Sequence, residues 1–119
     1  MIVTQDDETI DQILSSVESI CKKYPEKYWL ELDKAQSYPT EFVKSMTESG
    51  HLNALIPTKY GGAGLSLLIA ARILEKIHQS GCNAAAAHAQ MYTMGSILKY
   101  GSEAQKSKWL PLIAKGEVR

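Results

Sequence analysis

The sequence predicts an all-α fold, a compact orthogonal or up-and-down bundle of about six helices in one domain of 119 residues. Three observations lead to this prediction. Apolar residues recur every three or four positions in most segments, as in helices with one buried face. Glycine and proline separate these segments at positions where helices usually begin or end. No run of five or more residues alternates apolar and polar side chains as a strand would.

The pattern of apolar residues in the N-terminal half predicts three helices. A helix over residues 5–23 has an apolar stripe made of Ile10, Ile13, Leu14, Val17, Ile20 and Cys21. Pro25 ends it, and a short helix over residues 26–35 follows. The third helix is expected to begin at Pro39, because proline is favoured at the first helical position. Gly50 lies where a left-handed residue commonly ends a helix.

The same kind of pattern in the C-terminal half predicts three more helices. Ser66 is a suitable N-cap for a helix over residues 67–80. The longest helix is expected over residues 83–100, and Gly101 ends it. The last helix is expected over residues 103–115, with Ser102 and Gln105 spaced as a capping box.

Pro111 lies inside this last predicted helix. Proline lacks an N–H group and its ring clashes with the preceding turn, so we expect it to split or kink the helix.

A connector over residues 50–66 is the longest break in the helical pattern, and it contains four of the eight glycines. Tyr60 is its one large ring, and flanking glycines allow the chain to fold over that ring. Residues 61–64, Gly-Gly-Ala-Gly, also suggest a phosphate-binding loop, but their spacing fits neither the dinucleotide fingerprint nor the P-loop. We therefore expect a tight turn packed around Tyr60.

Composition excludes several classes of protein. Thirteen basic residues balance thirteen acidic ones, so we expect no nucleic-acid partner and no binding to anionic membranes. No apolar run approaches the ~20 residues that span a bilayer. Residues 1–7 are polar and acidic, unlike a signal peptide, and we expect a cytoplasmic location. Cys21 and Cys82 are too few for a disulfide framework, and we expect buried reduced thiols.

The three histidines do not form a metal site, since no pair has i, i+4 spacing and no carboxylate triad accompanies them. His51 follows a helix end and is expected to be solvated. His78 is expected near the C-terminal end of its helix, where a cation suits the dipole. His88 lies in mid-helix beside the small residues 84–87. Two interpretations stay open for His88: a hydrogen-bonded interior or interface residue, or a polar group lining a ligand cavity.

Two sequence blocks resemble the N-terminal domain of acyl-CoA dehydrogenases. The first has Gly50, an apolar pair, and then Pro-x-x-Tyr-Gly-Gly-x-Gly over residues 57–64. The second is Tyr-Gly-Ser-Glu-Ala-Gln-Lys over residues 100–106, followed by Trp-Leu-Pro at 109–111 and Gly-Glu at 116–117. Their order and spacing match, and the resemblance covers roughly residues 25–119. The first twenty or so residues carry no motif of this family.

The resemblance implies an N-terminal domain of an FAD-dependent enzyme that dehydrogenates acyl-CoA thioesters between the α and β carbons. In this family FAD is held mainly by a middle β-domain and a C-terminal helical domain, which we expect to be absent from this chain. The family's catalytic base is a glutamate beyond the N-terminal domain, so we expect no catalytic residue here and an inactive fragment. The implied partners are an acyl-CoA substrate, an electron-transfer flavoprotein or oxygen, the remaining domains, and further copies in a homo-oligomer.

The same likeness predicts the substrate-binding residues. The helix before Gly101 resembles the helix that lines the fatty-acyl tail in this family. Its small side chains either permit close helix packing or leave room for a ligand. On the second interpretation, the predicted pocket residues are Ala84, Ala85, His88 and Tyr92.

Two alternative functions are considered. The same scaffold occurs in acyl-CoA oxidases, nitroalkane oxidases and flavin monooxygenases. A different class is a non-catalytic helical interaction module derived from this domain.

Overall fold

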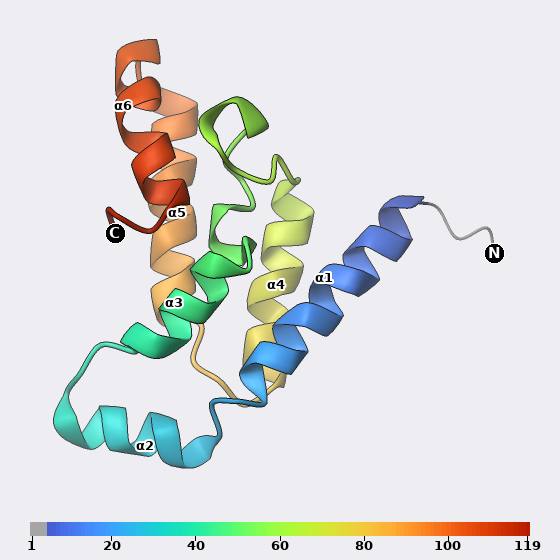
Figure 1. The fold of residues 1–119 in the computed structure, drawn as a ribbon, viewed down its shortest axis with the longest axis vertical. Coiled ribbons are helices and arrows are strands. Elements are labelled where there is room, and N and C mark those ends of the chain that lie inside the picture. Colours follow the sequence, from blue (N-terminus) through green and yellow to red (C-terminus); the bar gives the residue numbers. More distant parts are fainter. Residues whose placement is uncertain (1–4) are drawn as a thin grey trace.

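The computed structural model describes residues 5–119, and within that range it contains six α-helices, two short 3₁₀ helices and no strand (Figure 1). The α-helices are α1 (Gln5–Cys21), α2 (Glu26–Ala35), α3 (Thr40–Glu48), α4 (Leu67–Gln79), α5 (Ala85–Tyr100) and α6 (Glu103–Ala114). The 3₁₀ helices η1 (His51–Asn53) and η2 (Thr58–Tyr60) both lie in the connector. The all-α prediction is confirmed.

Two predicted helix starts are slightly wrong. Pro39 is the N-cap of α3 and not its first residue. Helix α5 begins at Ala85, two residues later than predicted, because the Oδ1 atom of Asn83 accepts a hydrogen bond from the Ala85 N–H at 2.8 Å. The Asn83 side chain therefore satisfies a free donor at the helix start from outside the helix.

Pro111 does not split α6, which continues to Ala114. The helix hydrogen bonds continue past the proline, since the Lys115 N–H donates to the Pro111 carbonyl oxygen at 3.2 Å. Leu110 and Ile113 flank Pro111 and are both buried, so core packing holds the last turn in helical geometry. The capping box of Ser102 and Gln105 is present as predicted.

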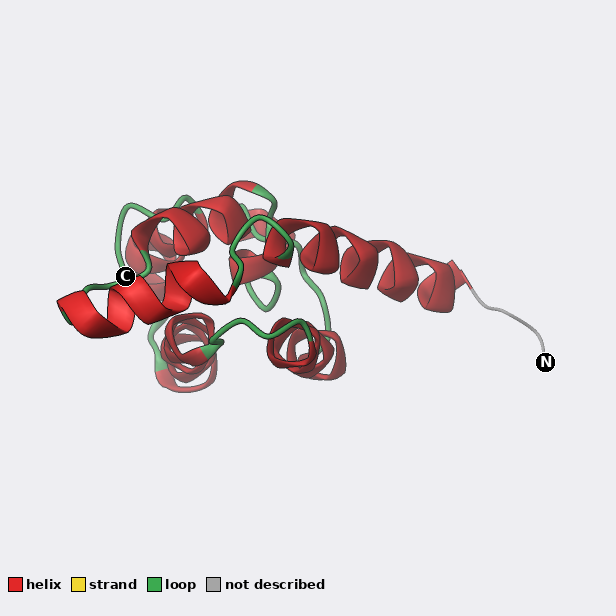
Figure 2. Cartoon of the chain, turned by 90° about the horizontal axis from the view of Figure 1, so that it is seen from below, coloured by secondary structure: helices red, strands yellow, loops and turns green. Residues whose placement is uncertain are grey.

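The helices form a flat molecule of 43 × 42 × 19 Å. Helices α4 and α5 run antiparallel, and a short loop joins them at one end (Figure 1). Seen from below, these two helices lie side by side and are viewed nearly end-on (Figure 2). Helix α1 packs against α3 and α4, and α6 packs against α5. One broad surface of the α4–α5 pair is therefore left open.

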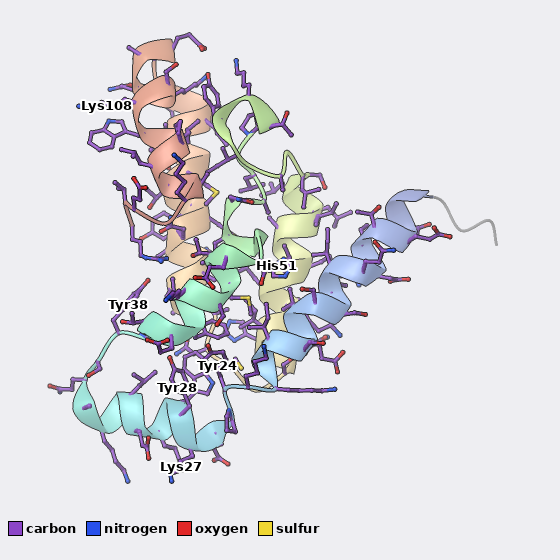
Figure 3. The ribbon with its side chains drawn as sticks, viewed as in Figure 1. Tyr24, Lys27, Tyr28, Tyr38, His51 and Lys108 are labelled. Atoms are coloured by element: carbon purple, nitrogen blue, oxygen red, sulfur yellow. The ribbon has the colours of Figure 1, made fainter. Side chains whose placement is uncertain are left out.

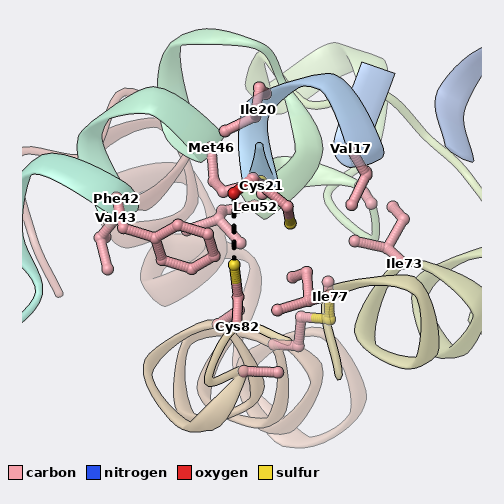
Figure 4. Close-up of a cluster of buried hydrophobic side chains, with 14 of the residues drawn as sticks. Val17, Ile20, Cys21, Phe42, Val43, Met46, Leu52, Ile73, Ile77 and Cys82 are labelled. Carbon is pink, nitrogen blue, oxygen red and sulfur yellow. Dashed lines mark hydrogen bonds between the residues drawn. The ribbon is translucent and has the colours of Figure 1, made fainter. Parts of the chain in front are cut away.

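A larger core lies between α1, α3, α4 and the first half of α5 (Figure 4). Phe42 is fully buried at its centre, and it meets the rings of Trp29 and Tyr24 edge-to-face at centroid distances of 4.9 and 5.5 Å. The Cys82 thiol points to the Cys21 carbonyl oxygen at 3.6 Å. Both cysteines are buried and free, as predicted. Burial and the neighbouring Cys82 raise the pKa of Cys21 to about 12, so its thiol is protonated at neutral pH.

A smaller core joins the connector to α5 and α6. Its buried members are Ile56, Tyr60, Met94, Leu110, Ile113 and Ala114. The Tyr60 hydroxyl donates a hydrogen bond to Glu103 Oε2 at 3.1 Å, which ties the connector to the start of α6. Gly62 has no room for a side chain, because a Cβ atom there would lie 2.0 Å from the Ile56 carbonyl oxygen. The predicted tight turn around Tyr60 is confirmed, and the two sequence blocks meet in it.

The prediction that His51 is solvated is wrong. His51 is only 6% exposed, and its Nε2 lies 2.9 Å from Ser16 Oγ of α1 (Figure 3). Gly50 adopts φ 80° and so turns the chain inward directly before His51. Burial lowers the pKa of His51, because the charged imidazolium loses its hydration there.

Candidate functional site

The candidate site is built on the outer face of α5. A helix turns about 100° per residue, so positions 85, 88 and 92 fall on one side of it. Ala85, His88 and Tyr92 are all exposed on that side, and Tyr92 remains 60% exposed. The rings of His88 and Tyr92 meet edge-to-face at a centroid distance of 5.5 Å. This face of α5 therefore exposes one small side chain, Ala85, and the two contacting rings of His88 and Tyr92.

An apolar groove runs between α4 and α5 beside this face and has a volume of about 270 Å³. It is lined by Leu55, Leu67, Ala70, Ala71, Leu74, His88, Met91, Tyr92 and Gly95. Leu67 is 74% exposed at its rim. The lining contains no Asp, Glu, Lys or Arg side chain, so the groove suits an apolar group.

A second hollow of about 830 Å³ lies where α2 and the α2–α3 loop approach the start of α5. Ala85 and Ala86 line it together with Trp29 and Tyr38. Ala85 therefore belongs to this hollow, whereas His88 and Tyr92 belong to the α4–α5 groove. The outer face of α5 passes from one hollow to the other within about one helical turn.

The structure does not bring together all four predicted substrate-binding residues, Ala84, Ala85, His88 and Tyr92. Ala84 is 1% exposed and packs in the larger core, so it does not lie on the open face. Leu55, Leu67 and Gly95 line the groove but were not predicted. A usable indication for Leu67 was present in the sequence, since it directly follows the N-cap Ser66 and lies off the buried stripe of its helix. The sequence around Leu55 and Gly95 carries no pattern that predicts a groove, because these residues reach the groove only through the packing of the helices.

The glycine-rich loop is not free to hold a phosphate group. The N–H groups of Gly62, Ala63, Gly64 and Leu65 donate to the carbonyl groups of Pro57, Asn53, Ile56 and Ala54, at 2.7–3.2 Å. A phosphate loop needs such donors to point at its ligand. The loop therefore serves the fold, and its donors do not fit the pyrophosphate of FAD.

The interaction between Tyr60 and Glu103 at the connector is also structural. The Tyr60 hydroxyl, together with Lys106 and Lys59, lowers the pKa of Glu103. Glu103 is exposed and opens α6, where a carboxylate suits the helix dipole. Among residues 5–119, no group of three histidine, cysteine or carboxylate side chains is placed to hold a metal ion. Over the same range, no helix has both the length and the apolar character needed to cross a bilayer.

Comparison with known proteins gives a consistent answer. Residues 7–117 match the family described as acyl-CoA dehydrogenase, N-terminal domain. A short-chain specific acyl-CoA dehydrogenase of rat mitochondria (Rattus norvegicus) is 34% identical over 105 residues, which are 82% of this chain and 25% of the relative. A short-chain specific acyl-CoA dehydrogenase of Clostridium acetobutylicum is 36% identical over 90 residues, 73% of this chain and 24% of the relative.

A third relative has a different named reaction. The 3-sulfinopropanoyl-CoA desulfinase of Paraburkholderia xenovorans is 30% identical over 88 residues, 71% of this chain and 22% of the relative. The chain spans about a quarter of the length of these curated relatives.

Proposed function

Because the chain belongs to the acyl-CoA dehydrogenase family as an N-terminal domain, we propose that it forms one wall of the acyl pocket in an FAD-dependent acyl-CoA dehydrogenase. The complete enzyme is then a longer protein that contains this chain. The middle β-domain and C-terminal helical domain lie outside the chain. The observation that carries the proposal is the exposed face of Ala85, His88 and Tyr92 beside the α4–α5 groove, whose lining has no Asp, Glu, Lys or Arg.

The chemistry divides between this domain and the rest of the enzyme. FAD accepts the hydride when bound, and the other domains hold it, since the glycine-rich loop here has no free donors. The residues of α5 contact the apolar tail, exclude water from it and limit its length. Electron-transfer flavoprotein or oxygen receives the electrons, and the enzyme is a homo-oligomer. A cytoplasmic location of the enzyme stays a prediction.

A second candidate is another reaction of a CoA thioester on the same scaffold. The relative named as a desulfinase supports this candidate, because its name specifies a sulfinopropanoyl-CoA substrate. Reduction of enzyme-bound flavin by a saturated acyl-CoA distinguishes the two. A flavin that stays oxidised in the complete enzyme with every acyl-CoA tested contradicts the dehydrogenase proposal.

The pocket proposal is tested with Ala85→Leu in the complete enzyme, by measuring kcat/KM over a series of acyl-CoA chain lengths. Each methylene of lost fit changes discrimination by roughly 1–3 kcal/mol, so long or branched acyl groups should lose more activity than short ones. Ala85 is exposed in this domain, so added volume there should not disturb the core.

Ala104→Leu is the matched control, because Ala104 is an exposed helical alanine on α6. It should leave the chain-length profile unchanged. A uniform loss of activity in Ala85→Leu that follows a lowered melting temperature would contradict the pocket proposal.

A further inference from the structure

Two polar side chains lie on one wall of the α4–α5 groove, whose other walls are apolar. The lining consists of leucine, alanine, methionine and glycine, apart from His88 and Tyr92. Both of these come from α5, where positions four apart lie on the same face. Their rings meet edge-to-face at a centroid distance of 5.5 Å, so the contact restricts how the imidazole turns. The groove therefore has one wall that is able to form hydrogen bonds.

Neither polar group is used inside the domain. Among residues 5–119, the His88 imidazole and the Tyr92 hydroxyl form no hydrogen bond with another group of the protein. By contrast, the imidazole of His51 is paired with a serine of α1, and the Tyr60 hydroxyl is paired with a carboxylate of α6. The histidine and tyrosine that stabilise the fold are thus paired, whereas those in the groove can pair with a ligand.

A third hollow, of about 470 Å³, lies between α5 and α6 on the other side of the same helix and shows the difference. The short hydroxyl side chains of Thr93 and Ser96 line it. They donate to the carbonyl oxygens of Ala89 and Tyr92, one turn earlier in α5, each at 2.9 Å. The helix backbone therefore already uses these two hydroxyl groups.

We propose that His88, with Tyr92 beside it, selects an acyl-CoA whose tail carries a hydroxyl group on an otherwise apolar carbon chain. This inference rests on the proposed function, because it places the acyl tail against the outer face of α5. A tail that fills the groove displaces the water around the imidazole, and a polar group left unpaired in a closed pocket is costly. A hydroxyl group on the tail that pairs with His88 removes this cost.

The charge of the groove favours a hydroxyl group over a carboxylate. No Lys or Arg side chain lines the groove to balance a carboxylate, and a buried charge is costly unless it is paired. A hydroxyl group both donates and accepts, and a neutral imidazole offers one nitrogen of each kind. The groove volume of about 270 Å³ is that of about nine water molecules at ~30 Å³ each, which limits the tail to a short chain.

The experiment compares matched pairs of CoA thioesters on the complete enzyme. In each pair, the terminal methyl group of an acyl chain of about five to eight carbons is replaced by a hydroxyl group of similar size, and the series moves this hydroxyl along the groove. For the best-fitting pair, kcat/KM should be about tenfold higher for the hydroxylated member, roughly the factor that one hydrogen bond contributes. A ratio of one or less at every length overturns the proposal, and so does a preference for the corresponding carboxylated thioester.

Variants of His88 locate the cause of this preference. His88→Leu should bring the ratio close to one, whereas His88→Asn keeps a donor and an acceptor and should retain part of the preference. His88 is exposed in this domain, so neither change disturbs the core. His78→Leu is the matched control and should keep the wild-type ratio, because His78 is exposed on α4 and does not line the groove. A His88→Leu enzyme with the wild-type ratio overturns the proposal.

A binding measurement separates this proposal from the proposed function. CoA thioethers with the same pairs of tails lack the carbonyl group that makes the α-proton acidic, so they bind without being dehydrogenated. Isothermal titration calorimetry gives their Kd values. A hydroxyl preference that depends on His88, in an enzyme whose flavin stays oxidised with every saturated acyl-CoA, contradicts the dehydrogenase function alone. An enzyme that reduces its flavin but shows no such preference contradicts this inference alone.

Discussion

The two cores of this domain are built differently. The larger core combines apolar stripes from four helices, and its centre is the fully buried Phe42 with edge-to-face aromatic neighbours. The smaller core has only six buried members, and its position depends on a tyrosine hydroxyl and a glycine that cannot be replaced. The larger core is stabilised mainly by the burial of apolar side chains. The smaller core depends on a specific hydrogen bond and a close backbone contact.

This difference explains where the family's recognisable sequence lies. A core formed by the apolar faces of helices tolerates many apolar substitutions of similar volume. Such a core therefore needs no fixed sequence motif. A turn that excludes every Cβ atom at Gly62 and orients Tyr60 toward Glu103 accepts few substitutions. The two sequence blocks therefore meet at one tertiary contact, the hydrogen bond between the Tyr60 hydroxyl and Glu103.

The largest expected effect is that of Gly62→Ala in the smaller core. The new Cβ atom would overlap the Ile56 carbonyl oxygen, which is backbone and cannot turn aside. The unfolding free energy should fall by about 3 kcal/mol or more, at the upper end of overpacking costs. Urea denaturation followed by far-UV circular dichroism measures it.

Gly95→Ala is the matched control, because nothing lies within 4 Å of a Cβ atom at that position of α5. It should raise the unfolding free energy by about 0.5–1 kcal/mol, since alanine loses less entropy in a helix. Equal effects of the two substitutions would refute this account of the turn.

An intermediate effect is expected from acid at the edge of the larger core. Burial holds the pKa of His51 below its ordinary value, so the unfolded chain binds more protons as the pH falls through about 6.5. Stability is therefore full above that pH and declines below it, with a slope of at most ~1.4 kcal/mol per pH unit from this one group.

Melting temperatures measured between pH 8 and pH 5 check this prediction. His51→Gln should flatten the profile over that range, because no proton is then taken up at this place. His78→Gln, on the exposed last turn of α4, should keep the wild-type slope. A profile for His51→Gln as steep as that of the wild type would count against a role for the buried imidazole.

The smallest effect is expected from Tyr60→Phe. The ring still fills the smaller core, and only the hydrogen bond to the exposed Glu103 is lost. The pKa of Glu103 should move up toward its ordinary value, because the Tyr60 hydroxyl is the main cause of its lowering. NMR titration of the Glu103 carboxyl group measures this shift. An unchanged titration would show that the lysines alone determine it.

Sequence patterns located the helices well, because each depends on short-range periodicity and end residues. Ser66 and Ser102 both cap helices as predicted, at Ile69 and Gln105. The prediction that Pro111 would split α6 was wrong, because buried residues on both sides of the proline keep the helix continuous to Ala114. The prediction for His51 was wrong for a similar reason: a residue after a helix end is often solvated, but here α1 covers it.

Of the four residues predicted to bind the substrate, Ala85, His88 and Tyr92 lie on the open face of α5, whereas Ala84 packs in the core. Their role in substrate binding stays a prediction. Periodicity shows which positions share a side of a helix, but it does not show which side meets another helix. Gln90 illustrates the same limit, since its contact with Val118 spans 28 residues.

The sequence by itself determined the all-α class, the place of each helix and the turn around Tyr60, because propensity, caps and glycine geometry act within a few residues. Tertiary structure alone decided that Tyr60 meets Glu103, that His51 is buried, and that grooves flank α5 on two sides. These features depend on contacts between residues far apart in the chain, and only the packing of whole helices creates them.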